Sequence, residues 1–272
     1  METTPTRLAA TVLLLRDASP MHAAGASAME VFMVVRHHEI EFASGALVFP
    51  GGRVDDDDHH IAANPALFPV GHGLDVEQAA LRVAAIREMF EETGILLARP
   101  NDSYVLVDAA TLAALEQQRA QLNAGELSFT QFLIAESLIL APDLLVRFAH
   151  WITPVAMRKR YDTHFFMAVA PPDQLAVHDG SEAVDSVWIT PAEAIADSTT
   201  GRFKLLFPTE MNLGKLARHT SAAAALAAAA ASQVVPVQPE VLQNADGSRA
   251  MRIPAAADYG GDVFQANNPL AI

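Results

Sequence analysis

The sequence contains no cysteine and little positive charge. Its 272 residues include 18 lysines and arginines against 32 aspartates and glutamates, which gives a formal net charge of −14. Without cysteine the chain cannot form disulfides, thiolate metal sites or a cysteine nucleophile. The negative charge argues against a nucleic-acid-binding surface, because a phosphate backbone is bound by lysine and arginine. An anionic substrate would therefore need local help from a metal ion and individual arginines.

Long hydrophobic runs and targeting signals are also missing. No apolar stretch reaches the roughly 18 residues of a membrane span, and the alanine tract at 222–231 is too short and too weakly hydrophobic. The N-terminus lacks the basic region and apolar core of a signal peptide, and the final residues, 269–272, are not a Ser-Lys-Leu address. We expect no membrane partner and a cytoplasmic location. Hydrophobic residues make up 51% of the chain, which is ample for a core.

Three carboxylates are crowded together in the run Arg-Glu-Met-Phe-Glu-Glu-Thr-Gly at residues 87–94. On a helix, Glu88, Glu91 and Glu92 are separated by three and four positions, so they point the same way. Like charges at this spacing repel by about 0.2–0.5 kcal/mol per pair. A hard cation such as Mg²⁺ would compensate, and it usually shares its oxygen ligands with substrate phosphates. The run thus suggests a metal-dependent enzyme acting on a phosphate compound, but taken alone it is more typical of a solvated acidic helix face, and the context must decide.

A glycine turn precedes this run, in Val-Phe-Pro-Gly-Gly-Arg-Val-Asp at residues 48–55. A β-rich segment breaks there, and glycines let the backbone approach a ligand closely. Together the two segments resemble the Nudix hydrolase signature. That signature is a glycine, five residues, a glutamate, seven residues, then Arg-Glu, an aliphatic residue, any residue, Glu-Glu, any residue, Gly and an aliphatic residue. Its second half matches fully, from Arg87 to Ile95.

The first half of the signature departs from the pattern. Counting back from Arg87 puts Ala79 where the first glutamate should stand. The glycine pair, Gly51-Gly52, lies too early in the chain. We interpret residues 55–74 as an insertion that splits the signature.

A split signature is typical of one Nudix branch, which includes peroxisomal coenzyme A and acyl-coenzyme A diphosphatases. Similar stretches lie at 36–55, 84–88 and 151–166, and the resemblance runs from about residue 8 to 217. It implies an α/β fold: a Nudix-type α/β/α sandwich with a mixed sheet over residues 1–217. A second insertion, at about residues 104–140, would be helical. Residues 218–272 would form an Ala-rich helix and a Pro/Gly/Ala-rich tail packed on the domain.

Local patterns predict the individual elements. The helix at 75–93 has Asp75 as its N-terminal cap and Gly94 as its stop. A break at 123–126 divides the 104–140 region into two helices. Two more helices are expected, one from Pro191 and one at about 209–231. Predicted strands lie at 8–16, 30–36, 46–49, 144–152, 163–170 and 185–189.

The resemblance also implies the metal site. Glu88, Glu91, Glu92 and the carbonyl of Gly52 match the family's ligands for Mg²⁺ or Mn²⁺. The metal would neutralise the diphosphate oxygens and activate a water. Arg87 belongs to the same catalytic set, and in the family it pairs with the first glutamate of the signature. With Ala79 at that position, Arg87 needs another partner, for which the candidates are Asp55, Asp56 and Glu77.

Several residues are candidates for the general base and for the substrate contacts. Glu182 and Asp185 precede a strand where many relatives carry an acidic residue, so either could activate water; the alternative is a solvated acidic turn. One of the glutamates of the signature could also be the general base. The candidate phosphate contacts are Arg36, Arg53 and Arg160, the last within the cluster 158–160, which could meet a 3′-phosphate or be an ordinary basic turn. Three aromatic residues could stack on adenine or belong to the core: Phe42, Phe165 and Phe166.

The histidines indicate no zinc site. His59 and His60 follow four aspartates, and we expect a disordered acidic loop there, with a metal tract as the alternative. The ten histidines include no convincing His-x-x-x-His spacing on a helix, which is the common arrangement of zinc ligands on one helical face.

The predicted function is hydrolysis of the diphosphate bond in a nucleoside diphosphate linked to another moiety. Coenzyme A or acyl-coenzyme A, cleaved to 3′,5′-ADP and a phosphopantetheine, is the favoured substrate. Two alternatives stay open: an ADP-ribose or NADH pyrophosphatase, and a non-catalytic nucleotide-binding module, which Ala79 favours. The expected partner is a small-molecule nucleotide. A homodimer is also expected, because Nudix enzymes often pair.

Overall fold

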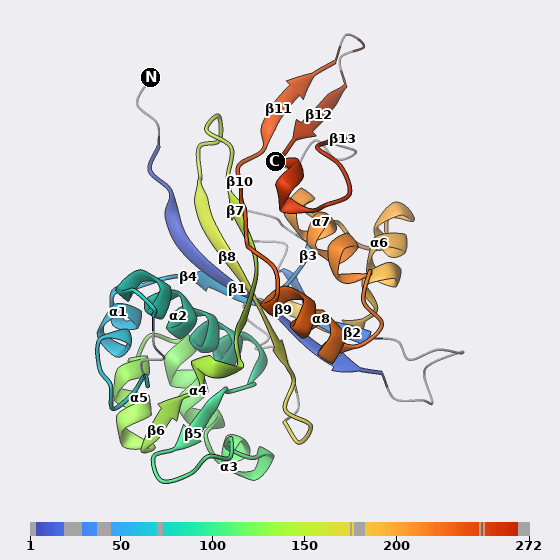
Figure 1. The fold of residues 1–272 in the computed structure, drawn as a ribbon. Helices are drawn as coiled ribbons and strands as arrows, with labels where there is room; N and C mark the ends of the chain where they lie inside the picture. Colours follow the sequence, from blue (N-terminus) through green and yellow to red (C-terminus); the bar gives the residue numbers. More distant parts are fainter. Residues whose placement is uncertain are drawn as a thin grey trace.

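The protein is an α/β sandwich built on one mixed sheet (Figure 1). The computed structural model describes residues 4–18, 29–36, 45–69, 73–174, 176, 183–244, 246 and 248–265, with only the backbone at 36, 183 and 184. Within these ranges helices cover both faces of the sheet, as the α/β/α prediction requires. None of the described helices is long and apolar enough to cross a membrane.

The main sheet has β1 at its centre. Its described strands are β1 (Arg7–Asp17), β2 (Met29–Arg36), β3 (Leu47–Val48), β4 (Gly51–Arg53), β7 (Val146–Ile152), β8 (Tyr161–Val169), β9 (Ala183–Ile189) and β10 (Pro236–Val237). The main path runs β10-β7-β8-β1-β2-β3, with β4 paired to β1 and β9 to β2. β1 is parallel to β8 and antiparallel to β2 and β4, so the sheet is mixed.

Alternate side chains of β1 contribute to two different hydrophobic cores. Val12 and Leu14 point into one core, whereas Leu13 and Leu15 point into the other, because successive side chains of a strand face opposite ways. The first core is covered by α1 (Asp56–Ala62), α2 (Val76–Thr93), α4 (Glu116–Asn123) and α5 (Phe129–Ala135). The second lies under α6 (Pro191–Thr199), α7 (Phe207–Leu216) and α8 (Ala222–Ala230).

Helix α2 begins and ends where the sequence predicts. The carboxylate of Asp75 accepts a hydrogen bond from the N–H of Gln78 at 2.8 Å. Gly94 adopts a left-handed conformation, with φ of 74°, and its N–H donates to the carbonyl of Phe90. A side chain would be strained there, so glycine ends the helix. The three glutamates of α2 thus have a fixed register.

The acidic tract after the glycine turn is a helix, so the prediction of a disordered loop is wrong. Asp55 caps α1 by accepting hydrogen bonds from the N–H groups of Asp57 and Asp58. Asp57 in turn accepts from the N–H and hydroxyl of Thr130 on α5. Carboxylates at a helix N-terminus are stabilised by its free N–H groups and its dipole, which explains why four aspartates start a helix here.

Two other helical predictions need correction. The 104–140 region has the expected break, but it holds a third helix, α3 (Ala109–Ala114), and ends in β6 (Leu138–Leu140), which pairs with β5 (Ala98–Pro100). The single helix expected at 209–231 is divided into α7 and α8. Ser221 caps α8, and Asp17 of β1 accepts a hydrogen bond from the N–H of Ala222. A contact distant in sequence therefore fixes this second start.

The C-terminal segment is tied to the domain. Strand β10 pairs with β7, and a separate sheet of β11 (Glu240–Gln243), β12 (Arg249–Arg252) and β13 (Val263–Gln265) follows, at the top of Figure 1. The buried hydroxyl of Tyr259 donates to Asn212 Oδ1 at 2.7 Å and accepts from Trp151 Nε1 at 3.0 Å. Lys215 Nζ also donates to the carbonyl of Ala257. These bonds hold the C-terminal segment against α7 and β7.

Substituting Tyr259 by phenylalanine should lower the free energy of unfolding by about 1–2 kcal/mol, because two buried hydrogen bonds are lost and only the 3.3 Å bond from Trp151 Nε1 to Asn212 Oδ1 remains between their partners. Urea titration followed by tryptophan fluorescence measures this, since Trp151 adjoins the substituted side chain. The matched control is Tyr104→Phe, whose side chain is 98% exposed and should leave the unfolding midpoint unchanged. Equal midpoints for both variants would show that the tyrosine does not anchor the segment.

Candidate active site

Glu88 of α2 meets the glycine turn at one end of a cavity of about 680 Å³. Gly52, Arg53, Asp55, Arg87 and Glu88 line this acidic end. Strand β4 carries the glycines and pairs with β1, while α2 crosses beside it. Two segments distant in sequence are thereby brought together, as the split signature predicts.

The glycine turn lets the backbone touch the carboxylates. The N–H of Gly51 donates to Glu92 Oε2 at 3.1 Å. A Cβ added to Gly52 would lie 2.3 Å from Glu88 Oε1, and one added to Gly51, at φ of 153°, would lie 2.4 Å from the carbonyl oxygen of Ala10. A side chain at Gly51 would clash with the backbone of β1, so this position requires glycine, whereas a side chain at Gly52 would displace the carboxylate of Glu88.

Arg87 lies among the carboxylates. Its Nε and Nη2 atoms each donate to Asp58 at 2.8 Å, and Nη2 also donates to the carbonyl of Arg53. Its Nη1 atom donates to Glu88 Oε1 at 2.9 Å and to Glu91 Oε2 at 3.0 Å. One guanidinium therefore orients two of the expected metal ligands and joins α2 to both α1 and β4.

The partner of Arg87 corrects the sequence interpretation. Of the three partners expected, only Asp55 contacts it, with a 3.6 Å ion pair, and the strong bidentate partner is Asp58. Ala79 is instead a buried residue of the core. Asp58 is the sixth residue after Gly52, the spacing that separates glycine from glutamate in the Nudix signature. We therefore place the insertion after Asp58 and not at Asp55. Counting forward from the glycine, and accepting aspartate for glutamate, would have found this residue.

Burial and nearby charges shift the pKa values of the groups in this cluster. Burial raises the pKa of Glu91 to about 7, and the charge of Glu88 adds to the rise, although Arg87 opposes it. Burial also raises the pKa of Asp58, with Arg87 again opposing. Burial alone would lower the pKa of Arg87, but its hydrogen bond to Asp58 and the charges of Glu88, Asp58 and Glu91 raise it well above its usual range. Arg87 therefore stays charged at every working pH.

The donor set fits a hard divalent cation. The carboxylates of Glu88, Glu91 and Glu92 and the backbone at Gly52 offer only oxygen ligands, which Mg²⁺ and Mn²⁺ prefer. The carboxylate of Glu88 occupies the space that a Cβ on Gly52 would need, so the Gly52 backbone and this carboxylate are close neighbours. These are the residues that would hold the metal implied by the sequence.

Metal affinity should depend on pH through Glu91. Because the pKa of Glu91 is raised to about 7, a proton competes with the metal below that pH. We expect Mg²⁺ affinity, measured calorimetrically, to rise between pH 6 and pH 8 and to fall by up to about tenfold per pH unit below 7. Glu91→Gln should bind more weakly and without this slope, whereas Glu77→Gln, exposed in the first turn of α2, should keep it. Equal wild-type affinity at pH 6 and pH 8 would contradict this titration.

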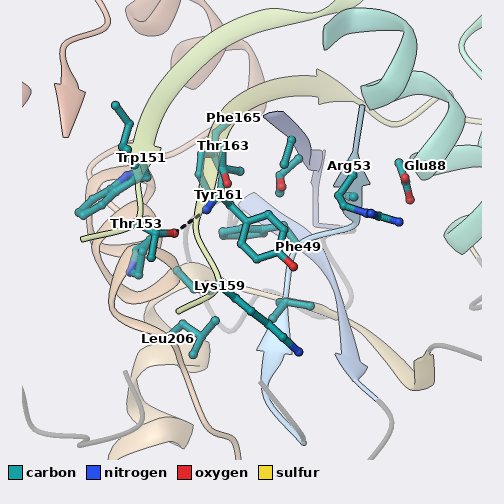
Figure 2. Close-up of a pocket in the computed structure, with 18 of the residues that line it drawn as sticks. Phe49, Arg53, Glu88, Trp151, Thr153, Lys159, Tyr161, Thr163, Phe165 and Leu206 are labelled. Carbon is teal, nitrogen blue, oxygen red and sulfur yellow. Dashed lines mark hydrogen bonds between the residues drawn. The ribbon is translucent and has the colours of Figure 1, made fainter. Parts of the chain in front are cut away.

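The opposite end of the cavity is apolar and aromatic. Figure 2 shows Arg53 and Glu88 together at one side, with Trp151 and Leu206 at the other and Lys159 and Tyr161 between. The further lining residues of the apolar end come from β3 and its flank, β8, α7 and the C-terminal segment: Phe49, Phe165, Phe207, Pro239 and Met251. The cavity can therefore hold a ligand with an anionic and an apolar part.

The remaining predicted site residues do not all line the cavity. Arg160 is buried, and it donates to the carbonyls of Thr153 and Thr4, which ties two strand ends together. Its neighbour Lys159 lines the cavity instead. Asp185 is exposed, accepts a hydrogen bond from the N–H of Ser186 and is not among the residues that line the cavity.

The other predicted candidates lie outside the described residues, in the core or in the cavity wall. Glu182, Phe42 and the side chain of Arg36 lie outside the described residues. Phe166 belongs to the first hydrophobic core, whereas Phe165 contributes to the cavity wall. Lys159 belongs to the basic cluster 158–160 that the sequence offered as a candidate phosphate contact. The C-terminal wall was not predicted, because Pro239 and Met251 carry no local signal.

A family model described as the NUDT19 Nudix domain matches residues 70–216, just over half of the chain. The match includes α2 with its three glutamates. This chain belongs to the Nudix hydrolase family.

Curated relatives and solved structures agree with this membership. The Nudix chain is 25% identical over 227 residues to "Acyl-coenzyme A diphosphatase NUDT19" of Xenopus laevis, covering 69% of this chain and 59% of that relative. It is 28% identical over 268 residues to the protein of the same name from Gallus gallus, covering 79% of this chain and 69% of that relative. The chain thus spans about three fifths of the Xenopus protein's length. A Nudix hydrolase crystal structure from Alicyclobacillus acidocaldarius is 27% identical, with a TM-score of 0.65 over 82% of this chain and 96% of that one.

Proposed function

We propose that this Nudix protein is a diphosphatase that hydrolyses coenzyme A or acyl-coenzyme A to 3′,5′-ADP and a phosphopantetheine or acyl-phosphopantetheine. The observation that carries the proposal is the two-part cavity, with the carboxylate of Glu88 at one end and an apolar wall at the other. The names of the similar NUDT19 proteins point to the same substrate class.

The acidic end supplies the chemistry of diphosphate hydrolysis. Mg²⁺ or Mn²⁺, held by Glu88, Glu91, Glu92 and the carbonyl of Gly52, would neutralise the diphosphate oxygens and lower the pKa of an attacking water. The chain's own groups prepare this site. Arg87 orients Glu88 and Glu91 through hydrogen bonds of 2.9 and 3.0 Å, and the N–H of Gly51 orients Glu92. Fixed carboxylates need no reorganisation during reaction, which favours catalysis.

The rest of the cavity suits the other parts of the substrate. Arg53 and Lys159 bring positive charge to the lining, and such groups attract phosphates in a protein whose net charge is −14. Phe49 and Phe165 offer aromatic surface for adenine, and the apolar wall with Met251 offers space for pantetheine or an acyl chain.

The binding-module alternative loses its main support. It rested on Ala79 in place of an acidic partner for Arg87, and Asp58 now fills that role with two 2.8 Å hydrogen bonds. An ADP-ribose or NADH pyrophosphatase would use the same carboxylates, so only a substrate comparison separates it from the proposed activity.

The test is a substrate panel with product identification. Purified protein is incubated with Mg²⁺ or Mn²⁺ and coenzyme A, acyl-coenzyme A, ADP-ribose, NADH or a nucleoside triphosphate, and products are identified by mass. We expect 3′,5′-ADP from coenzyme A or its acyl ester. Turnover of ADP-ribose or NADH alone would overturn the substrate assignment and keep the diphosphatase. Tight nucleotide binding without any turnover would favour the binding module.

A further inference from the structure

A second group of metal-ligating side chains lies on the paired strands β7 and β8. His150 stands opposite His164 in the antiparallel register, and Asp162 is opposite the neighbouring Ile152. One ligand atom from each of His150, Asp162 and His164 lies within 4.8 Å of the others, which makes this trio a metal-ligating cluster of the described residues. Strand pairing thereby creates a cluster that the linear spacing of the histidines does not reveal.

The cluster faces away from the catalytic cavity. Tyr161, Thr163 and Phe165 of β8 line the cavity, so the alternating residues Asp162 and His164 project from the opposite face of the sheet. On β7, Trp151 likewise lines the cavity while His150 points the other way. The trio therefore lies behind the cavity wall, on the face that α2 covers, and shares no side chain with the α2 carboxylates.

The contacts within the trio converge on one oxygen. Asp162 Oδ1 makes a short contact with His150 Nε2 and lies 3.4 Å from His164 Nε2. The two imidazole rings stack with centroids 3.9 Å apart. Their side chains are only 12% and 11% exposed, against 27% for Asp162. Three ligand atoms thus meet at a partly buried point.

Two cations lie near the cluster. Arg147 and Arg82 are the cations that face His164. They act through space in a partly solvated setting, where repulsion is weakened, whereas three ligands would bond a metal directly.

We propose that His150, Asp162 and His164 form a zinc-binding site separate from the Nudix metal site, with one coordination position left to water. Two imidazole nitrogens and one carboxylate oxygen are ligands that zinc accepts at about 2.0–2.2 Å in a tetrahedral arrangement. Mg²⁺ prefers an all-oxygen set, so the two sites select different metals. Zinc here joins β7 to β8 directly behind the cavity wall formed by Trp151 and Tyr161, and stabilises that wall.

Zinc binding by the full-length protein provides the test. Protein stripped with a chelator is titrated with Zn²⁺, and bound metal is counted by inductively coupled plasma mass spectrometry. The double variant Glu88→Gln/Glu92→Gln is titrated in parallel to remove the Nudix site from the count. We expect one tightly bound zinc in both proteins. His150→Ala and the near-isosteric Asp162→Asn should each weaken binding about 100-fold or more, because even outer partners of metal ligands contribute about 10- to 100-fold.

The control variant is His60→Ala, which removes an exposed histidine of α1 and should keep the zinc. Zinc should also raise the melting temperature of the wild-type protein and of His60→Ala, but not that of Asp162→Asn, whose circular dichroism shows whether it folds. The proposal is overturned if the wild-type protein takes up no zinc, or if folded Asp162→Asn binds it as tightly as the wild type. Because the readout is bound zinc, the result is independent of the proposed diphosphatase activity.

Discussion

Replacing Glu88 by glutamine should lower kcat for diphosphate hydrolysis by about 10³-fold or more. The carboxylate of Glu88 lines the cavity and lies against the backbone of Gly52. A bound metal provides several kcal/mol of transition-state stabilisation, and about 4 kcal/mol corresponds to 10³-fold in rate. Glutamine keeps the size of the side chain but loses the charge that attracts the metal. Steady-state kinetics with product detection at saturating substrate measures the effect.

The matched control is Glu77→Gln, on the same helix and exposed in its first turn. It changes the protein's charge equally and should leave kcat within about twofold, since surface substitutions far from a site have small effects. Raising the Mg²⁺ concentration should partly restore Glu88→Gln if the loss is in metal affinity. A Glu88→Gln enzyme with wild-type kcat would remove this glutamate from the catalytic set.

Replacing Asp58 by alanine should lower the free energy of unfolding by about 3–5 kcal/mol. The side chain of Asp58 is fully buried, and its two oxygens accept from Arg87, which is itself only 8% exposed. Breaking a buried ion pair by removing one partner has a cost of this size. Glu88 and Glu91 still pair with Nη1 of Arg87, but its buried Nε atom loses the acceptor. Part of the loss comes from the α1 capping box, since Asp58 also accepts from the N–H of Asp55. Urea and thermal unfolding measure the change.

Two further variants separate the effect of losing the charge from the effect of losing the buried hydrogen bonds. Asp56→Ala removes an exposed carboxylate from the same helix turn and should cost less than about 1 kcal/mol, the usual contribution of a charge near a helix N-terminus. Asp58→Asn keeps the volume and one acceptor oxygen, so its cost should fall between the two alanine variants. If Asp58→Ala were no more destabilised than Asp56→Ala, Asp58 could not be the residue that replaces the first glutamate of the Nudix signature.

Local sequence determined the part of the site that lies on one helix. Asp75 and Gly94 set the ends of α2, and the spacing of Glu88, Glu91 and Glu92 set their common direction. These features need only hydrogen bonds and dihedral preferences of nearby residues, so they can be predicted without tertiary contacts. The same holds for the glycine turn, where the lack of a side chain is itself the signal.

Tertiary structure decided the features that join distant segments. The sequence offered several acidic partners for Arg87, and the fold selected Asp58, 29 positions away, because docking of α1 against α2 buries both groups together. Pairing of β7 with β8 likewise brought His150 to His164. The C-terminal segment placed Met251 at the apolar end of the cavity. Such contacts depend on which faces of helices and strands pack together, and side-chain spacing along the chain does not encode that choice.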